Sequence, residues 1–221
     1  MNKLFGSVKV LVWDFDGTFY KPNPTLFHAV RESEYAAIMK HTGWSREKTI
    51  AEFQKLHKVT MQSATAVIAV LCDISIARAA VESEDQFDRR TYLKRDDQLI
   101  AMFAKLKKFR HVILANGVIA KHKETLRVLG ISPDTFEDFV SAETVGVTKP
   151  DPAGFVYILK KTGLPPNTHM MIGDRELVDL APAKALGMHT CLVWSETKSE
   201  IADVTLPTVY EVPMLFSHDK S

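Results

Sequence analysis

The chain has 221 residues, 46% of them hydrophobic and 25% charged, and its formal net charge is +1. This length and composition are ordinary for a soluble globular protein of one domain, or of one domain that carries an insertion. The near-neutral charge gives no electrostatic reason to expect binding to a nucleic acid polymer or to an anionic membrane surface.

The sequence also lacks the usual signals for a membrane or secretory destination. The longest apolar run, residues 66–72, is far too short to cross a bilayer. The opening residues, MNKLFGSVKV, have no continuous apolar stretch and no cleavage site of a secretory signal. The two cysteines, Cys72 and Cys191, form no CxxC pair and are expected to be buried thiols. We therefore expect a cytoplasmic protein with no membrane segment.

The first predicted element is a strand over residues 8–15, an almost continuous apolar run typical of a parallel strand covered on both faces. It ends in WDFDGTFY, where Asp14 and Asp16 stand one residue apart and Gly17 allows a tight turn. Residues two apart in an extended chain face the same side. Carboxylates at the end of a buried strand are costly unless they are paired, bound to a metal or used for chemistry.

A helical block follows, and no convincing strand interrupts it between residues 21 and 96. At about 75 residues, this block is too long for a simple crossover between two strands. We predict that residues 21–96 form an inserted helical cap domain and that residues 1–20 and 97–221 form the core. The predicted helices span residues 25–41, 46–57, 61–71, 76–83 and 85–93.

The rest of the chain alternates between strands and helices, which predicts an α/β fold with a Rossmann-like parallel sheet. Asp151 and Asp179 are expected to be N-caps, with Pro152 at the first position of its helix. A short strand and a closing segment are expected over residues 204–216. The predicted strands span residues 111–116, 138–142, 169–174 and 189–194, and the helices span 119–129, 152–162 and 180–186.

Polar side chains gather at the predicted carboxyl ends of these strands, where open parallel sheets bind their ligands. They are Asp14, Asp16, Asn116 and Asp174, with Lys149 in a nearby loop. Clustered carboxylates repel one another, and a set of oxygen ligands without His or Cys favours Mg²⁺ over zinc. A carboxylate can attack phosphorus, while a second one serves as general acid and base. Lysine and magnesium would offset the charge on the phosphoryl oxygens.

These motifs resemble those of the haloacid dehalogenase (HAD) superfamily. The resemblance is carried by DFDGT (14–18), Asn116, KPDPAGF (149–155) and GDRELVD (173–179), and it extends through LAPAKALGMHTCLVW (180–194). Each motif alone is weak, but their order and their places on strands and loops make the combination specific. The match covers residues 8–15 and roughly 103–194, whereas the cap is similar only in position and composition.

The resemblance implies a role for each residue. Asp14 would be the nucleophile and a metal ligand, and Asp16 the general acid and base, with its backbone carbonyl on the metal. Lys149 would hold the nucleophile and the phosphate, Asp174 would bind Mg²⁺, and Asp179 would support the site from outside the metal's ligands. Dehalogenases of the superfamily lack the second aspartate, so the presence of Asp16 favours phosphoryl transfer.

One position departs from the family pattern: Ala115 stands where the family normally has a Ser or Thr hydroxyl that binds a phosphate oxygen. Backbone amides of Asn116 and Gly117, or the Asn116 side chain, could replace it. The expected function is a Mg²⁺-dependent phosphatase that hydrolyses a small phosphomonoester, of the sugar phosphate or nucleotide monophosphate type, through an aspartyl-phosphate. The alternatives are a phosphomutase and a weakly active or non-catalytic phosphate-binding homologue. The oligomeric state is open.

The sequence gives less definite predictions for four residues near these motifs. His122, near the start of its helix, could reach the mouth of the site, but it is expected at the surface. Arg175 and Glu176 are expected to be structural or solvent-facing and not catalytic. Tyr20 could line the pocket or pack in the hinge, and the sequence does not separate these alternatives.

Overall fold

The structure, a computed structural model, describes residues 5–21, 23–59, 63–85 and 87–217. In this part of the chain, six parallel strands form one sheet in the order β3-β2-β1-β4-β5-β6. The predicted α/β fold is confirmed, including the short strand near the C-terminus. The strands are β1 (Val10–Trp13), β2 (Arg110–Leu114), β3 (Asp138–Val140), β4 (His169–Gly173), β5 (His189–Leu192) and β6 (Val204–Thr205).

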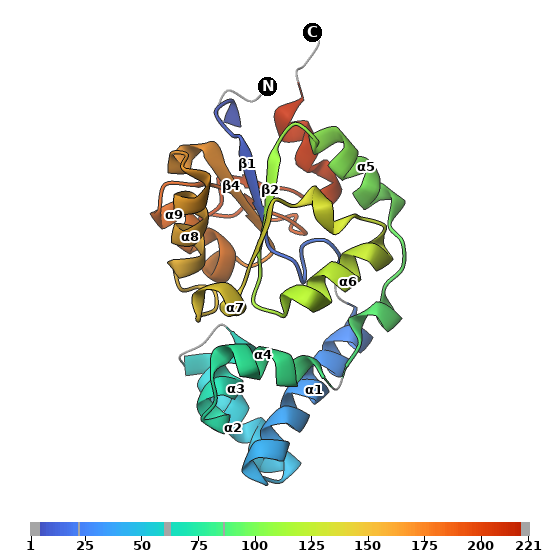
Figure 1. The fold of residues 1–221 in the computed structure, drawn as a ribbon, viewed down its shortest axis with the longest axis vertical. Helices are drawn as coiled ribbons and strands as arrows, with labels where there is room; N and C mark the ends of the chain where they lie inside the picture. Colours follow the sequence, from blue (N-terminus) through green and yellow to red (C-terminus); the bar gives the residue numbers. More distant parts are fainter. Residues whose placement is uncertain (1–4, 22, 60–62, 86, 218–221) are drawn as a thin grey trace.

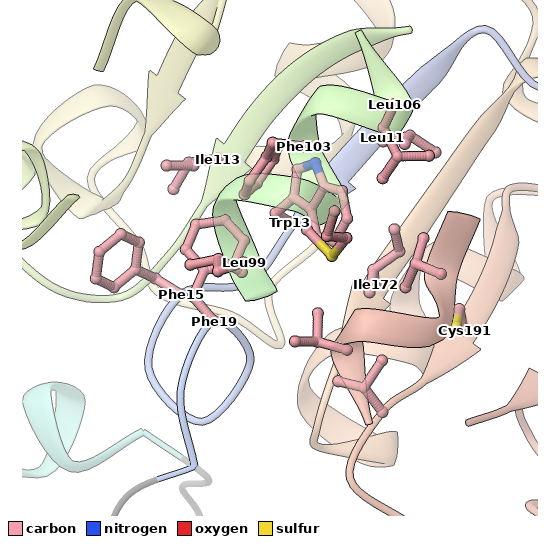
Figure 2. Packing of buried hydrophobic residues seen from close by; sticks show 14 of the residues in the cluster. Leu11, Trp13, Phe15, Phe19, Leu99, Phe103, Leu106, Ile113, Ile172 and Cys191 are labelled. Atoms are coloured by element: carbon pink, nitrogen blue, oxygen red, sulfur yellow. The ribbon is translucent and has the colours of Figure 1, made fainter. Parts of the chain in front are cut away.

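Helices cover both faces of this sheet (Figure 1). Val10 and Val12 of β1 pack in an apolar cluster with α8 and α9, while Leu11 and Trp13 pack with α5, α6 and η6 on the opposite face. Figure 2 shows Trp13 close to Phe103 of α5 in the second cluster. Because both faces are covered, every position of β1 is apolar and buried. The core helices are α5 (Asp97–Leu106), α6 (Ile119–Leu129), α7 (Ala142–Val145), α8 (Ala153–Thr162), α9 (Ala181–Ala185) and the 3₁₀ helix η6 (Val209–Phe216), with short 3₁₀ turns η3 (Pro133–Thr135) and η4 (Pro166–Thr168).

The segment between β1 and α5 folds into a separate group of helices beyond the carboxyl edge of the sheet, opposite the two chain ends (Figure 1). These helices have an apolar cluster of their own, which includes Ile38, Phe53 and Ile68. We call them the helical segment. Its elements are α1 (Pro24–Thr42), α2 (Arg46–Val59), α3 (Ala64–Cys72), α4 (Ile76–Glu84) and the 3₁₀ turn η2 (Arg89–Tyr92).

Four of the five helices predicted in this segment are present within a few residues. The predicted start of the third at Met61 lies outside the described residues, and α3 begins at Ala64 after a Ser63 cap. The predicted helix over 85–93 is wrong, since the described residues of this stretch form only the short turn η2. The Asp88 side chain accepts the N–H of Arg90, so it caps this turn instead of continuing α4.

The predicted N-cap role of Asp179 is also wrong. The helix does not start after Asp179 but three residues before it, with the π-helical turn η5 (Glu176–Leu180) running into α9. Asp179 is therefore inside the turn, and its carboxylate is free to point at the sheet edge. At α8 the difference is one residue, since the Asp151 side chain accepts the N–H of Ala153 and the helix begins there.

Among the described helices, none alone has the length and apolar character to cross a membrane, and α3 with α4 reaches them only as a pair bent by 107°. Both cysteines are free, with Cys191 buried and Cys72 partly buried.

Candidate active site

The site forms at the topological switch point of the sheet, where the strand order changes direction. β1 lies between β2 and β4. Strands β2 and β3 lie on one side of β1, and β4, β5 and β6 lie on the other. The carboxyl ends of β1 and β4 meet at this switch point, and the Asp14 N–H donates to the carbonyl of Ile172 at 2.9 Å. Such a point in an open parallel sheet is a usual ligand site. The topology therefore brings Asp14 and Asp174 together at one edge.

Lys149 lies at the centre of the buried charges. Its Nζ is 2.5 Å from Oδ1 of Asp14 and 2.7 Å from Oδ1 of Asp179, and the hydroxyl of Thr18 donates to Oδ2 of Asp14 at 3.1 Å. Burial alone would raise the pKa of Asp14, but the charges of Lys149 and Arg175 outweigh it and hold that pKa below its usual value. Asp14 is thus an ionised carboxylate with one oxygen fixed by a cation.

The carboxylate of Asp174 has one oxygen without a partner. Its Oδ1 is buried and accepts no hydrogen bond within the described residues. Burial, followed by the charges of Asp14 and Asp179, raises the pKa of Asp174 to about 8. Carboxylate oxygens of these three residues lie within 4.8 Å of one another. A divalent cation fits this donor set, because it would neutralise the repulsion and supply the missing partner.

Two glycines make room for this cluster. Gly17 has a φ of +89°, and a Cβ there would lie 2.5 Å from Oδ2 of Asp174. At Gly173 a Cβ would lie 2.6 Å from Oδ2 of Asp179. Any larger residue would therefore displace a carboxylate of the site.

Both oxygens of Asp179 are already engaged, one by Lys149 and the other by the N–H of Arg175 at 3.1 Å. These contacts are typical of a residue that fixes Lys149, and they leave neither Asp179 oxygen free to bind a metal directly. Arg175 and Glu176, which were expected to be structural or solvent-facing, are partly buried and line the cavity beside the cluster.

Asn116 does not present its side chain to the cavity as a free donor. Its Oδ1 accepts the N–H of Lys149 at 2.8 Å, and its Nδ2 donates to the carbonyl of Lys149 at 3.1 Å. The side chain therefore fixes the backbone that carries Lys149. Ala115 is buried in the apolar cluster of α5. Asn116 and Gly117 both line the cavity next to it.

Asp16 lies apart from the other carboxylates and is the more exposed, with 43% of its side chain accessible. The hydroxyl of Tyr20 donates to its Oδ1, and Nη2 of Arg89 lies 3.5 Å from its Oδ2. Tyr20 both lines the cavity and packs against Phe15, so the two alternatives drawn from the sequence hold together.

The surface position predicted for His122 is wrong, because its side chain is 1% exposed. It packs on the ring of Phe15 with centroids 4.4 Å apart, and its Nε2 lies 3.9 Å from Oδ2 of Asp16. Burial lowers the pKa of His122 to about 4, so the imidazole is neutral near pH 7. Its helical spacing to Leu126 and Leu129 places it on the buried face of α6, a signal that was available in the sequence.

Arg89 and Glu84 were not singled out from the sequence. Arg89 Nη2 lies 3.2 Å from Oε1 of Glu84, whose other contact is the N–H of Val118 at 3.3 Å. A Cβ on Gly117 would lie 2.6 Å from the same Glu84 oxygen. No local pattern marks these residues, since Glu84 ends α4 and Arg89 opens the short turn η2.

A cavity of about 710 Å³ separates the sheet edge from the helical segment. Its floor comes from loops of the core and its walls from the helices. The core contributes Asp16, Gly17, Tyr20, Asn116, Gly117 and residues 174–178, and the helical segment contributes Leu26, Phe27, Val30, Arg31, Glu34, His57, Ser63, Ala64, Thr65, Ser83, Glu84, Phe87 and Arg89.

The chain is similar to known proteins in sequence and in fold. The chain is 35% identical to a glyceraldehyde 3-phosphate phosphatase of Methanocaldococcus jannaschii over 91 residues, which is 41% of this chain and 40% of that protein. It is 26% identical to the enzyme of the same name from Methanopyrus kandleri over 196 residues, covering 83% and 82% of the two chains. The fold matches a HAD phosphatase from Thermococcus onnurineus with a TM-score of 0.68 at 19% identity, covering 97% of this chain and 100% of that one. The family model described as haloacid dehalogenase-like hydrolase matches residues 8–187. The chain therefore belongs to the haloacid dehalogenase-like hydrolases.

Proposed function

We propose that this hydrolase is a Mg²⁺-dependent phosphatase that cleaves a small phosphomonoester through an aspartyl-phosphate on Asp14. The observation that carries the proposal is the state of Asp14, a buried carboxylate kept ionised and oriented by Lys149 below a large cavity. Its relatives named glyceraldehyde 3-phosphate phosphatases support a phosphate ester as the substrate.

The reaction follows from the roles of the side chains. Oδ2 or Oδ1 of Asp14 attacks phosphorus, the bond to the ester oxygen breaks, and Asp16 passes a proton to that oxygen. In the second half, Asp16 takes a proton from water, whose oxygen attacks phosphorus and releases phosphate from Asp14. Lys149 offsets negative charge on the nucleophile and on the phosphoryl oxygens throughout.

The metal would be held by Asp14, Asp174 and the backbone carbonyl of Asp16. When bound, Mg²⁺ supplies positive charge that stabilises the phosphoryl group during its transfer. The fit rests on the unpartnered Oδ1 of Asp174 and on the all-oxygen donor set. Asp179 acts through Lys149 in this scheme.

Backbone N–H groups of Asn116 and Gly117 bind the phosphate oxygens that a hydroxyl at Ala115 would otherwise contact. The Asn116 side chain is committed to the Lys149 backbone, so it contributes by placing the lysine. A hydrogen bond to a charged group is worth about 1.5–3 kcal/mol. The absence of the hydroxyl therefore favours a slower enzyme than a relative that has it.

The helical segment, residues 21–96, serves as the cap over a core of residues 1–20 and 97–221. This segment supplies more than half of the residues that line the cavity, so the cap contacts the leaving group and keeps water from the phosphoryl group. Sugar phosphates and nucleotide monophosphates are the substrate classes that we propose.

Phosphate release from a panel of phosphomonoesters tests the function, with Mg²⁺ and then with a chelator. Turnover that requires magnesium and is lost in Asp14→Asn supports a phosphatase. An isomerised sugar phosphate in place of free phosphate would identify a phosphomutase. Binding of phosphate without turnover of any ester would identify a non-catalytic homologue, the alternative that Ala115 motivates.

A further inference from the structure

A group of buried charges joins the returning end of the helical segment to the loop that carries Asp16. Nη2 of Arg89 lies 3.2 Å from Oε1 of Glu84 and 3.5 Å from Oδ2 of Asp16. The hydroxyl of Tyr20 donates to the other oxygen of Asp16, and Nε2 of His122 lies 3.9 Å from Oδ2. Both oxygens of the Asp16 carboxylate therefore lie near side chains of other residues, from the loop itself, from η2 and from α6.

The side chains of this group differ in their exposure to the cavity, which indicates different roles. The Arg89 side chain is 8% exposed and that of Glu84 is 10% exposed, whereas 43% of Asp16 is accessible from the cavity side. The second terminal nitrogen of Arg89, Nη1, is buried and has no hydrogen-bond partner in the described part of the chain. A guanidinium that is enclosed in this way has little surface to offer a substrate. Asp16 is the most accessible of the three side chains, although Arg89 and Glu84 also line the cavity.

This group is also more than an anchor for the helical segment. Burying the Arg89 guanidinium and the Glu84 carboxylate costs free energy that their attraction only partly returns. The neighbouring Arg90 already links the same turn to the core by an exposed ion pair with Glu124 at 3.1 Å. A buried ion group beside Asp16 is thus not required to attach η2 to α6.

From these contacts we infer that Arg89 is a positioning residue, which fixes the carboxylate of Asp16 for proton transfer to the leaving oxygen. The inference rests on the proposed function and names a residue of the helical segment that acts through Asp16. Because Glu84 also accepts the N–H of Val118, Arg89 is held between the helical segment and the core. The orientation of Asp16 then depends on where the helical segment lies.

The test compares two esters that differ in their need for a proton. The phenolate of 4-nitrophenyl phosphate leaves without protonation, whereas the alkoxide of glycerol phosphate requires it. We expect Arg89→Gln to lower kcat/KM for glycerol phosphate by about 10- to 100-fold and for 4-nitrophenyl phosphate by less than about 3-fold, since misplacement of an acid affects only the proton-dependent step. The quantity kcat/KM reports the transfer to Asp14 and is independent of the later attack by water.

The ratio of the two values is taken from one preparation, so loss of folded protein cannot produce the effect. Arg90→Gln is the matched control and leaves the ratio unchanged, and Arg89→Lys restores part of it. An equal fall for both esters with an unchanged ratio would overturn the inference while leaving the phosphatase function intact, because it would indicate substrate binding or general damage. Failure of the unmodified protein to hydrolyse either ester would overturn both.

Discussion

The ammonium nitrogen of Lys149 lies 2.5 Å from Oδ1 of Asp14, although 135 residues separate the two in the sequence. Three features of the fold produce this pair: the parallel neighbours β1 and β4, the Asn116 side chain that fixes the Lys149 backbone, and Asp179 on the far side of the ammonium group. The pair leaves Asp14 ionised and oriented in a buried position, as the nucleophile of a phosphoryl transfer requires.

Replacement of Lys149 by Met should therefore damage both stability and catalysis. It removes the cation that contacts two buried carboxylates, Asp14 and Asp179, and breaking such a buried pair typically costs about 3–5 kcal/mol of unfolding free energy. Loss of its charge at the reacting centre should lower kcat by about 10²–10³-fold. Urea unfolding and phosphate release measure the two effects.

A double variant separates them. Lys149→Met with Asp179→Asn removes one of the unpaired charges, so stability should partly return while activity stays low. Lys160→Met, an exposed lysine of α8, is the control for a loss of charge at the surface. A Lys149→Met protein with unchanged stability and activity would refute the proposed role of the pair.

Magnesium should stabilise the folded protein through Asp174. Because Oδ1 of Asp174 has no partner and faces two further carboxylates, a bound cation removes a repulsion present in the free protein. We expect millimolar magnesium to raise Tm in the unmodified protein, and Asp174→Asn to remove most of the rise. Glu196→Gln, at an exposed position, should keep it. An equal rise in the Asp174 variant would place the metal elsewhere.

Gly17→Ala should weaken the site beyond the ordinary cost of a positive φ. Gly17 and Gly43 have φ values of +89° and +68°, so alanine at either is expected to cost about 1–2 kcal/mol. Only at Gly17 would the new Cβ meet a carboxylate, whereas nothing lies within 4 Å at Gly43. Thermal melts should show similar losses, but only Gly17→Ala should also lose phosphatase activity and the magnesium response. Equal activity in both variants would contradict this reading of Gly17.

Glu34 should make the protein less stable as the pH rises. Burial raises the pKa of Glu34 from 4.5 to about 7, despite the Arg31 guanidinium 2.8 Å away. Between these values the unfolded chain releases the proton and the folded chain keeps it. Its stabilising contribution is thus full below pH 4.5 and is lost as the pH rises through about 7, by roughly 3 kcal/mol at most.

Urea unfolding at pH 5 and pH 8 checks this prediction. Glu34→Gln should lose less stability between the two pH values than the unmodified protein does. The exposed Glu200→Gln should behave like the unmodified protein. The same loss in all three proteins would show that Glu34 does not titrate in this window.

The sheet and the grouping of Asp14 and Asp174 were predictable, because apolar strand patterns end directly at these residues and parallel strands align their carboxyl ends. Lys149 follows no strand directly, and its place near the site was predicted from the loop before the next helix and from the family resemblance. The surface position predicted for His122 was wrong, although its spacing to Leu126 and Leu129 indicates the buried face of α6. Arg89 had no such signal, because its position depends on how the helical segment packs on the core and not on any local period.

The π-helical turn that carries Asp179 also has no local signature. The turn starts at Glu176, three residues before Asp179, so this aspartate lies inside the turn and not at its N-cap. Sequence patterns therefore predicted the residues that follow strands, and failed where tertiary packing or an irregular turn decides which way a side chain points.

The central claim is that Asp14 becomes phosphorylated during turnover. The most direct measurement is a rapid acid quench with a hydrolysed ester and magnesium, followed by peptide mass analysis. The account predicts one phosphoryl group on Asp14 in the peptide that contains WDFDGTFY, and none in Asp14→Asn, which should also be inactive. Turnover without any phosphorylated peptide, together with an active Asp14→Asn protein, would contradict it.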